Sequence, residues 1–244
     1  MSENSIHTKK TFHSDPFLNP LVVALDVDHK EDALRLADQM SDIVGGFKLG
    51  PRLCLRYGAD LIQEISKRAP VFVDNKHFDI PSTMESAVRA SFEAGASAVS
   101  VHGLAGLEAL ELMAKLEQEL NQTRPFRILA ITVLTSWNAS SLPPILASQD
   151  IDQHVVQLAQ FVKKCGLRSM VCSAQELNEL SGIDLYKLTP GIRFDLEELN
   201  DQKRVMGPHE AIERGASAIV VGRPIIGAKD PRAKAMDYAT ALVT

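Results

Sequence analysis

The sequence predicts an α/β protein folded as a single (β/α)8 (TIM) barrel, and two observations support this prediction. Eight short apolar runs recur at fairly even spacing, and segments of helical periodicity lie between them. The runs are mostly continuous in Val, Ile and Leu, which is typical of parallel strands that are covered on both faces. The expected strands are residues 21–26, 46–49, 71–74, 97–102, 127–132, 168–172, 185–189 and 217–222.

The expected helices are identified by apolar spacing and by their start and stop signals. Apolar residues fall on one face of segment 31–44, and three-residue stripes occur in 104–116 and 155–162. Pro81 followed by Ser82 is a helix start, and the pairs at 95–96 and 215–216 place a glycine where a helix ends before a strand. The alternative is an open doubly wound sheet. Eight near-equal repeats and the absence of a GxGxxG sequence favour the barrel.

Composition narrows the class of protein. The chain has 244 residues with a formal net charge of −5 and 5% aromatic residues, which argues against a general nucleic-acid binder. Three cysteines without a CxxC pair argue against a disulfide framework or a Cys-rich zinc site and fit a reducing cytoplasm. No apolar run reaches about 18 residues, so we expect no membrane span. We expect a cytoplasmic protein with a polar lead-in over 1–19 and one barrel domain over 20–244.

Ionisable residues stand where the first three expected strands end. The active site of such a barrel lies at the carboxyl ends of its strands. Five charged residues converge there: Asp26, Lys48, Asp74, Lys76 and Asp79. Any one of them is more readily interpreted as a solvated loop charge. All five together favour a functional site, because charged side chains are rarely buried unless they are paired.

The loops after the seventh and eighth strands have the composition of a phosphate site. Barrels often bind phosphate in these two loops, which here read TPGIR at 189–193 and VGRPI at 221–225. Gly191 and Gly222 allow backbone N–H groups to approach an anion, and Arg193 and Arg223 supply forked donors. We therefore expect a small phosphorylated substrate whose reacting end lies near Lys76.

Other polar residues at the mouth have simpler interpretations. His102 ends a strand without a second His or Cys at ligand spacing, which favours a hydrogen-bonded structural histidine over a metal ligand. The three carboxylates could hold magnesium, but the interleaved lysines would repel it. Cys172 is more readily interpreted as a buried, inert thiol than as a nucleophile.

One segment carries a family resemblance. Residues 74–83, DNKHFDIPST, resemble the DxKxxDIPxT signature of the orotidine 5′-monophosphate decarboxylases. One departure is NKHF at 75–78, where bacterial members commonly read LKFH; the signature Asp, Lys and Asp are retained. Further segments resemble the bacterial branch of this family in the same order and cover residues 20–240: VVALD (22–26), FKLG (47–50), AITVLTS (130–136), VCSAQE (171–176), TPGIR (189–193) and VGRP (221–224).

The resemblance implies a reaction and an assembly. The reaction is decarboxylation of orotidine 5′-monophosphate to uridine 5′-monophosphate and CO2, the last step of de novo pyrimidine biosynthesis, with no cofactor and no metal. The implied assembly is a homodimer with shared active sites, and neither nucleic acid nor membrane is an expected partner. Lys76 would stabilise the C6 carbanion and donate the proton. Asp74 would disfavour the charged ground state of the substrate carboxylate.

The resemblance also assigns the remaining site residues. Asp26 and Lys48 would bind the ribose hydroxyls, and Lys48 would also pair with Asp74. The residues that would reach in from the partner subunit are Asp79, Ile80 and Thr83. Thr135, with Ser136, would hold the pyrimidine. The residues on the phosphate side would be Pro190, Arg193, Gln202 in the loop 194–204, Gly222 and Arg223.

Three other classes of function compete with this interpretation. One is a magnesium-dependent sugar-phosphate decarboxylase or aldolase on the same barrel, and the second is a binder of phosphorylated ligands without catalysis. The third is a scaffold or interaction protein, which would leave the charged mouth unexplained. The sugar-phosphate enzymes carry an acidic residue where Lys48 stands, so Lys48 and the DIPxT segment argue against them. The presence of every expected charged group argues against a loss of catalysis.

Overall fold

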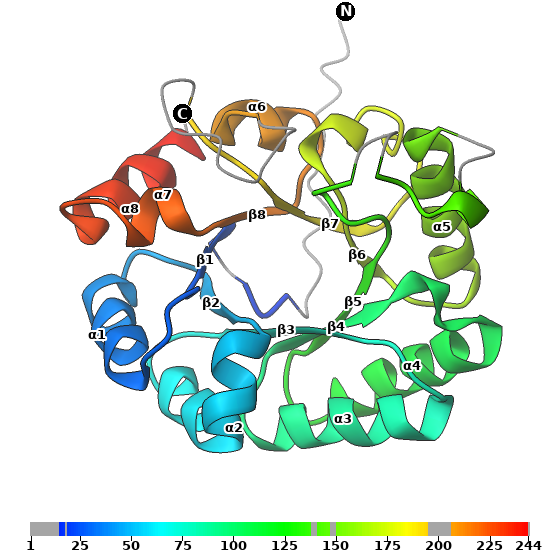
Figure 1. Cartoon of the computed structure of the whole chain (residues 1–244), viewed down its shortest axis with the longest axis horizontal. Coiled ribbons are helices and arrows are strands. Elements are labelled where there is room, and N and C mark those ends of the chain that lie inside the picture. Colours follow the sequence, from blue (N-terminus) through cyan, green and yellow to red (C-terminus); the bar gives the residue numbers. More distant parts are fainter. Residues whose placement is uncertain (1–14, 18, 138–140, 147–149, 195–205, 244) are drawn as a thin grey trace, which may run out of the picture.

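Eight parallel strands close into a barrel in sequence order, and helices surround it (Figure 1). The computed structural model describes residues 15–17, 19–137, 141–146, 150–194 and 206–243. β1 pairs with both β2 and β8, so the described sheet has no free edge. The predicted (β/α)8 barrel is confirmed.

The strands and helices alternate along the chain. The strands are β1 (Leu21–Ala24), β2 (Gly46–Leu49), β3 (Val71–His77), β4 (Ala98–His102), β5 (Arg127–Ile131), β6 (Ser169–Val171), β7 (Tyr186–Pro190) and β8 (Ala218–Val221). The α-helices are α1 (Lys30–Met40), α2 (Pro51–Ser66), α3 (Pro81–Glu93), α4 (Leu107–Leu120), α5 (Ile151–Lys164), α6 (Pro208–Glu213), α7 (Arg223–Ile226) and α8 (Pro231–Ala241). Short 3-10 helices are η1 (Gly103–Ala105), η2 (Pro144–Leu146) and η3 (Ala174–Glu176).

β3 differs from the strand that the sequence predicts. The other seven strands lie within two residues of their expected ends, whereas β3 continues three residues past Asp74 to His77. Its second half reads DNKH and carries no apolar signal, so hydrophobicity alone ends the strand too early. The pairing of β3 with β4 also shifts register between Val73 and His77. Bulges of this kind re-aim side chains beside active sites.

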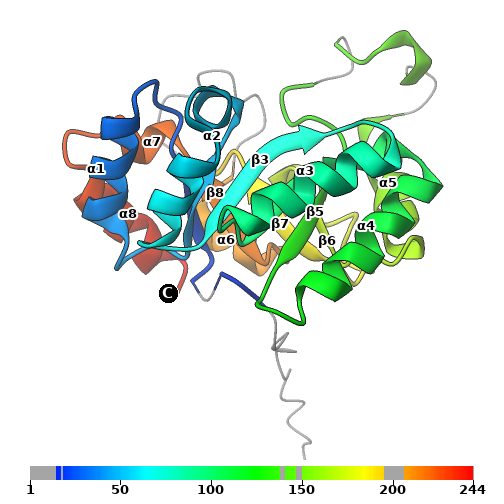
Figure 2. The same cartoon turned by 90° about the horizontal axis from the view of Figure 1, so that it is seen from below.

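The hydrophobic core has two parts. A large cluster lies between the strands and the helices, and in the side view α3 and α4 lie outside β3 to β5 (Figure 2). A smaller cluster of inward-facing residues fills the barrel and includes Val22, Phe72, Leu129 and Leu188. Within the described residues, the barrel interior is therefore packed below the carboxyl ends of the strands.

The described part of the expected lead-in packs against the amino end of the barrel. Phe17 is 4% exposed and joins the inner cluster. The side-chain amide of Asn19 donates to the carbonyl of Ile43 at 2.8 Å and accepts from the amide of Leu21 at 2.9 Å. Residues 1–14 lie outside the described residues. In the part of the chain that is described, no helix is both long and apolar enough to cross a membrane.

Candidate active site

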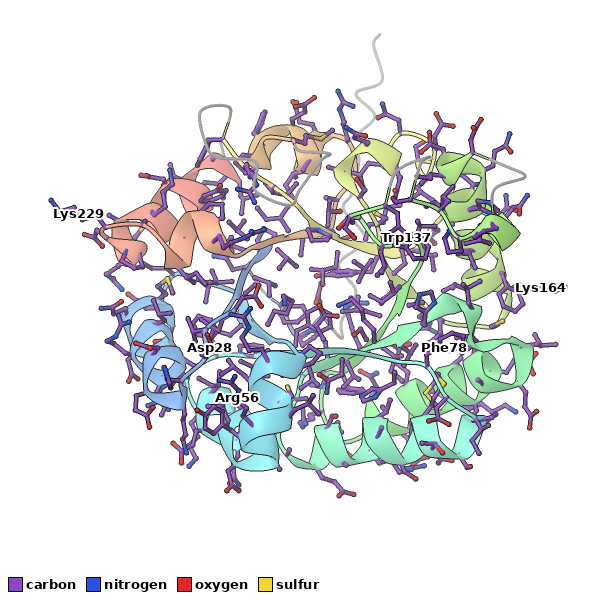
Figure 3. All side chains as sticks on the ribbon, in the orientation of Figure 1. Asp28, Arg56, Phe78, Trp137, Lys164 and Lys229 are labelled. Atoms are coloured by element: carbon purple, nitrogen blue, oxygen red, sulfur yellow. The ribbon has the colours of Figure 1, made fainter. Side chains whose placement is uncertain are left out.

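A pocket of about 220 Å³ opens at the carboxyl ends of the strands. Its apolar floor comes from inward-facing residues of the barrel, including Phe72, Leu188 and Val220. Figure 3 shows Phe78 and Trp137 on one side of the barrel interior and Asp28 with Arg56 on the other. The polar and loop residues that line the pocket are Asp26, Lys48, Asp74, Lys76, Thr135, Pro190, Gly191, Arg193, Gly222 and Arg223.

Four of the five predicted charged residues form a continuous network in this pocket. Lys48 Nζ lies 3.3 Å from Asp26 Oδ1 and 3.6 Å from Asp74 Oδ2. Lys76 Nζ donates to the same Asp74 Oδ2 at 2.9 Å. Adjacent parallel strands bring these side chains together, and both Asp74 and Lys76 of β3 line the pocket. The order along the pocket is therefore carboxylate, ammonium, carboxylate, ammonium.

Asp74 is the centre of the network and is only 8% exposed. Burial on its own raises the pKa of a carboxyl group. Here the ammonium groups of Lys48 and Lys76, with hydrogen bonds from Lys76 and Ser100, outweigh burial and hold the pKa of Asp74 below its usual value. The site therefore keeps a buried negative charge beside Lys76.

The backbone of Lys76 is in an unusual conformation. Lys76 has φ 52°, and no other non-glycine residue in the described part of the chain has a positive φ. A non-glycine residue in the left-handed region costs about 1–3 kcal/mol and persists only where its surroundings hold it. The conformation falls at the register shift of β3, which gives Lys76 its direction into the pocket.

Ser100 is a site residue that the sequence interpretation missed. It lies in β4, is fully buried, and its hydroxyl is 2.8 Å from Asp74 Oδ1 and 2.9 Å from the Lys76 amide nitrogen. The available signal was a polar residue inside an apolar run, two positions before His102. That signal alone does not reveal a partner on another strand.

Four predicted site residues do not line the pocket of their own chain. Asp79 Oδ1 accepts from the amide of Ile80 at 2.7 Å, outside the charged network. Ile80 is 64% exposed, and Thr83 and Ser136 are also exposed. The described residues of one chain thus bring together four of the five charged groups. Asp79, Ile80 and Thr83 are exposed, and none of them lines this pocket.

The far side of the pocket carries the two predicted arginines. Arg193 is 5% exposed, and its backbone is held by a hydrogen bond from its amide to the carbonyl of Met206. Arg223 is exposed and begins α7. Gly222 lies close to β1, because a Cβ added to it would be 3.4 Å from the Cβ of Ala24 and 3.5 Å from Asp26 Oδ2, which is ordinary contact distance. Gln202 lies outside the described residues.

His102 and Cys172 both have structural surroundings. His102 Nδ1 accepts from the amide of Leu104 at 3.2 Å, and its ring stacks on Phe78 with centroids 5.3 Å apart. Burial, and then the charge of Lys76, lower the pKa of His102. Cys172 is fully buried, and burial raises the pKa of its thiol to about 12. Within the described ranges, no three His, Cys, Asp or Glu side chains are grouped so that they could hold a metal ion.

The fold and the site define a barrel with a polar mouth at the carboxyl ends of its strands, where charges of opposite sign alternate. Residues 19–238 match the family described as "Orotidine 5'-phosphate decarboxylase / HUMPS family", so the chain belongs to this family.

Named relatives agree with this family. The orotidine 5′-phosphate decarboxylase of Vibrio atlanticus (strain LGP32) is 38% identical over 217 residues, covering 87% of this chain and 94% of the relative. That of Carboxydothermus hydrogenoformans (strain ATCC BAA-161 / DSM 6008 / Z-2901) is 39% identical over 224 residues, covering 89% and 93%. The crystal structure of orotidine 5′-phosphate decarboxylase from Lactobacillus acidophilus superimposes with a TM-score of 0.81 at 28% identity, covering 93% of this chain and all of that one.

Proposed function

We propose that this chain decarboxylates orotidine 5′-monophosphate to uridine 5′-monophosphate and CO2, as the last step of the de novo biosynthesis of uridine 5′-monophosphate. The observation that carries the proposal is the alternating network of Asp26, Lys48, Asp74 and Lys76 in the pocket of a chain from this family. The three cysteines are free, which supports our placement of the protein in a reducing cytoplasm.

Lys76 is the group that we assign to the chemistry. Loss of CO2 from C6 leaves a carbanion in the plane of the pyrimidine ring, where delocalisation is poor. A fixed ammonium group stabilises that charge and then supplies the proton. Lys76 Nζ is directed into the pocket and is held by Asp74 at 2.9 Å, so it needs little reorganisation when the charge develops.

Asp74 has two roles in this proposal. Its lowered pKa keeps it anionic, so it repels the substrate carboxylate in the ground state and fixes the ammonium of Lys76. We assign Asp26 and Lys48 to the ribose hydroxyls, because they lie at the β1–β2 end of the network and one is a hydrogen-bond acceptor while the other is a donor. These charged groups supply the chemistry from the chain's own side chains, without a cofactor or a metal.

We assign the opposite wall to the base and the phosphate. Arg193 and Arg223 supply the phosphate donors, beside Pro190 and Gly222, and Thr135 with the exposed Ser136 holds the pyrimidine. Gln202 would close over the phosphate. Because this contact is remote from C6, its binding energy can be used to order the site and raise turnover as well as affinity.

We further propose that the enzyme is a homodimer with shared active sites. Asp79, Ile80 and Thr83 are outside the pocket of their own chain but at the rim of the mouth, where a second subunit could receive them. Large apolar side chains are exposed in the same region, at Phe78, Ile80, Leu104 and Leu107. Mixing Lys76→Ala with Asp79→Ala subunits should restore activity, because a mixed dimer then contains one intact site. No restoration in dimers shown to be mixed would exclude the shared site.

The function is tested by the ultraviolet absorbance of orotidine 5′-monophosphate mixed with purified protein and EDTA. We expect the orotate chromophore to be lost as uridine 5′-monophosphate forms, and Lys76→Ala to abolish this while it remains folded by circular dichroism. No spectral change with folded wild-type protein would reject the decarboxylase assignment. Turnover of a sugar phosphate that requires magnesium would instead establish the alternative activity, and tight nucleotide binding without turnover would establish a binder.

A further inference from the structure

A register shift leaves Ser100 alone opposite three residues of β3. Val73 pairs with Val99 and His77 pairs with Val101. The three residues 74–76 of β3 therefore face one residue of β4, which is Ser100. Regular backbone pairing is lost over this stretch. The backbone N–H and C=O groups that regular pairing would satisfy therefore need other hydrogen-bond partners.

The hydroxyl of Ser100 hydrogen-bonds to both Lys76 and Asp74, and the direction of each hydrogen bond is fixed. The amide of Lys76 can only donate, so at 2.9 Å the oxygen of Ser100 accepts from it. The single hydroxyl proton is then left for Asp74 Oδ1 at 2.8 Å, and an ionised carboxylate can only accept. Both bonds are made by a side chain with no exposed surface. The network therefore runs from the Lys76 backbone through Ser100 to Asp74 and back to Lys76 Nζ.

We propose that Ser100 is a positioning residue, whose hydroxyl holds the Lys76 backbone in its left-handed conformation and Asp74 in the orientation that receives Lys76 Nζ. The proposal rests on the decarboxylase function proposed above. Ser100 does not line the pocket, so it acts through these two residues and not by contact with substrate.

Removal of the hydroxyl has a specific expected consequence. In Ser100→Ala the Lys76 amide loses its acceptor and Asp74 loses one donor, so the left-handed backbone is no longer held from β4. Lys76 Nζ then moves relative to the reacting carbon, while the groups assigned to ribose and phosphate keep their places. A positioning role thus predicts a loss in kcat and not in KM.

The test compares two fully buried serines of the barrel. Ser169 on β6 accepts a hydrogen bond from Arg127 Nη1 at 2.9 Å at the amino end of the barrel, away from the pocket. We expect Ser100→Ala to lower kcat for orotidine 5′-monophosphate at least tenfold and to change KM less than threefold. Ser169→Ala should leave both values within twofold. A kcat of Ser100→Ala within twofold of wild type overturns the proposal.

A second variant and a structural measurement separate positioning from loss of folding and from failure of the proposed function. Ser100→Cys keeps a weak donor and acceptor of similar size and should retain more of kcat than Ser100→Ala. In a crystal structure of either variant, we expect Lys76 φ or the Lys76 Nζ–Asp74 distance to change, and this readout needs no substrate. An unchanged Lys76 in the Ser100→Ala crystal overturns the proposal, whereas wild-type protein without decarboxylase activity rejects only the proposed function.

Discussion

Two buried carboxyl groups at opposite ends of the barrel respond to burial in opposite ways. Asp74 at the mouth and Glu117 at the amino end are 8% and 6% exposed. The pKa of Asp74 lies below its usual value, whereas burial raises the pKa of Glu117 to about 7. Nearly equal burial therefore gives opposite shifts, and the partners of each group decide the sign.

The partners differ in number and in charge. Asp74 has ammonium nitrogens at 2.9 and 3.6 Å, together with the hydroxyl of Ser100. Glu117, on α4, accepts one backbone hydrogen bond at 2.7 Å, from Ile128. The charges of Arg127 and Arg168 also lower its pKa, but they and this hydrogen bond do not outweigh burial. Neutral donors lower a carboxyl pKa less than close ammonium groups do. The mouth of the barrel thus keeps a fixed charge, while the amino end uses a carboxyl group chiefly to satisfy a strand amide.

The amino end also shows how a buried charge can be purely structural. Arg127 is 5% exposed, lies 3.3 Å from Asp15 and stacks over the ring of Tyr186 at 3.9 Å. The segment that carries Phe17 covers this end of the barrel. At the mouth, by contrast, the charged side chains line an open pocket. Access to a ligand, and not burial or charge alone, distinguishes the two ends.

The largest expected effect is the loss of activity when Arg223, which lines the pocket, is removed. We expect Arg223→Ala to lose about 30- to 5000-fold in kcat/KM for orotidine 5′-monophosphate, because removing one partner of a close charge pair costs about 2–5 kcal/mol. Steady-state kinetics measure it, with Arg232→Ala as the control, since Arg232 pairs with Asp42 on the surface away from the pocket. Near-wild-type kcat/KM for Arg223→Ala would remove it from the proposed phosphate site.

The next effect is the pH dependence of stability, to which Glu117 and Asp74 contribute with opposite signs. The folded pKa of Glu117 is raised from 4.5 to about 7, so its contribution to stability is fully present below pH 4.5 and is lost as pH rises through 7. Glu117→Gln removes this loss. Urea unfolding should therefore show that the free energy of unfolding of the variant rises relative to that of wild type, by on the order of 3 kcal/mol between pH 4.5 and 8. Asp74 has the opposite sign, with stability present above pH 3.8 and lost as pH falls below it. A pH-independent difference would contradict the raised pKa.

The smallest expected effect is a loss of stability without a loss of activity when the buried charge of Arg127 is removed. We expect Arg127→Met to lower the free energy of unfolding by about 2 kcal/mol. Breaking a fully buried ion pair costs about 3–5 kcal/mol, but Asp15 keeps some contact with water. The kcat/KM of the folded variant should stay within twofold of wild type, since Arg127 lies at the closed end. Chemical denaturation and steady-state kinetics on the same preparation measure both, and a large loss of activity without loss of stability would break the comparison.

The sequence predicts much of this architecture for a simple physical reason. Parallel strands covered on both faces must be continuously apolar, so eight such runs mark eight strands even without contacts between them. Charged residues directly after those runs must then gather at one end of the barrel. This is why Asp26, Lys48, Asp74 and Lys76 could be selected before their distances were known.

Only the tertiary structure decided how these residues are joined. The extension of β3 is polar and has no hydrophobic signal, and its register against β4 depends on both strands at once. The partnership of Ser100 with Asp74 and Lys76 spans 26 and 24 positions of sequence, and no local pattern encodes it. Phe17 belongs to a segment whose composition is polar, yet it is buried because the barrel's amino end needs an apolar cover. The sequence by itself determined the strands and the charged residue types, because these follow from local hydrophobicity. Partners, register and pKa directions follow from distances between strands, which exist only once the barrel has closed.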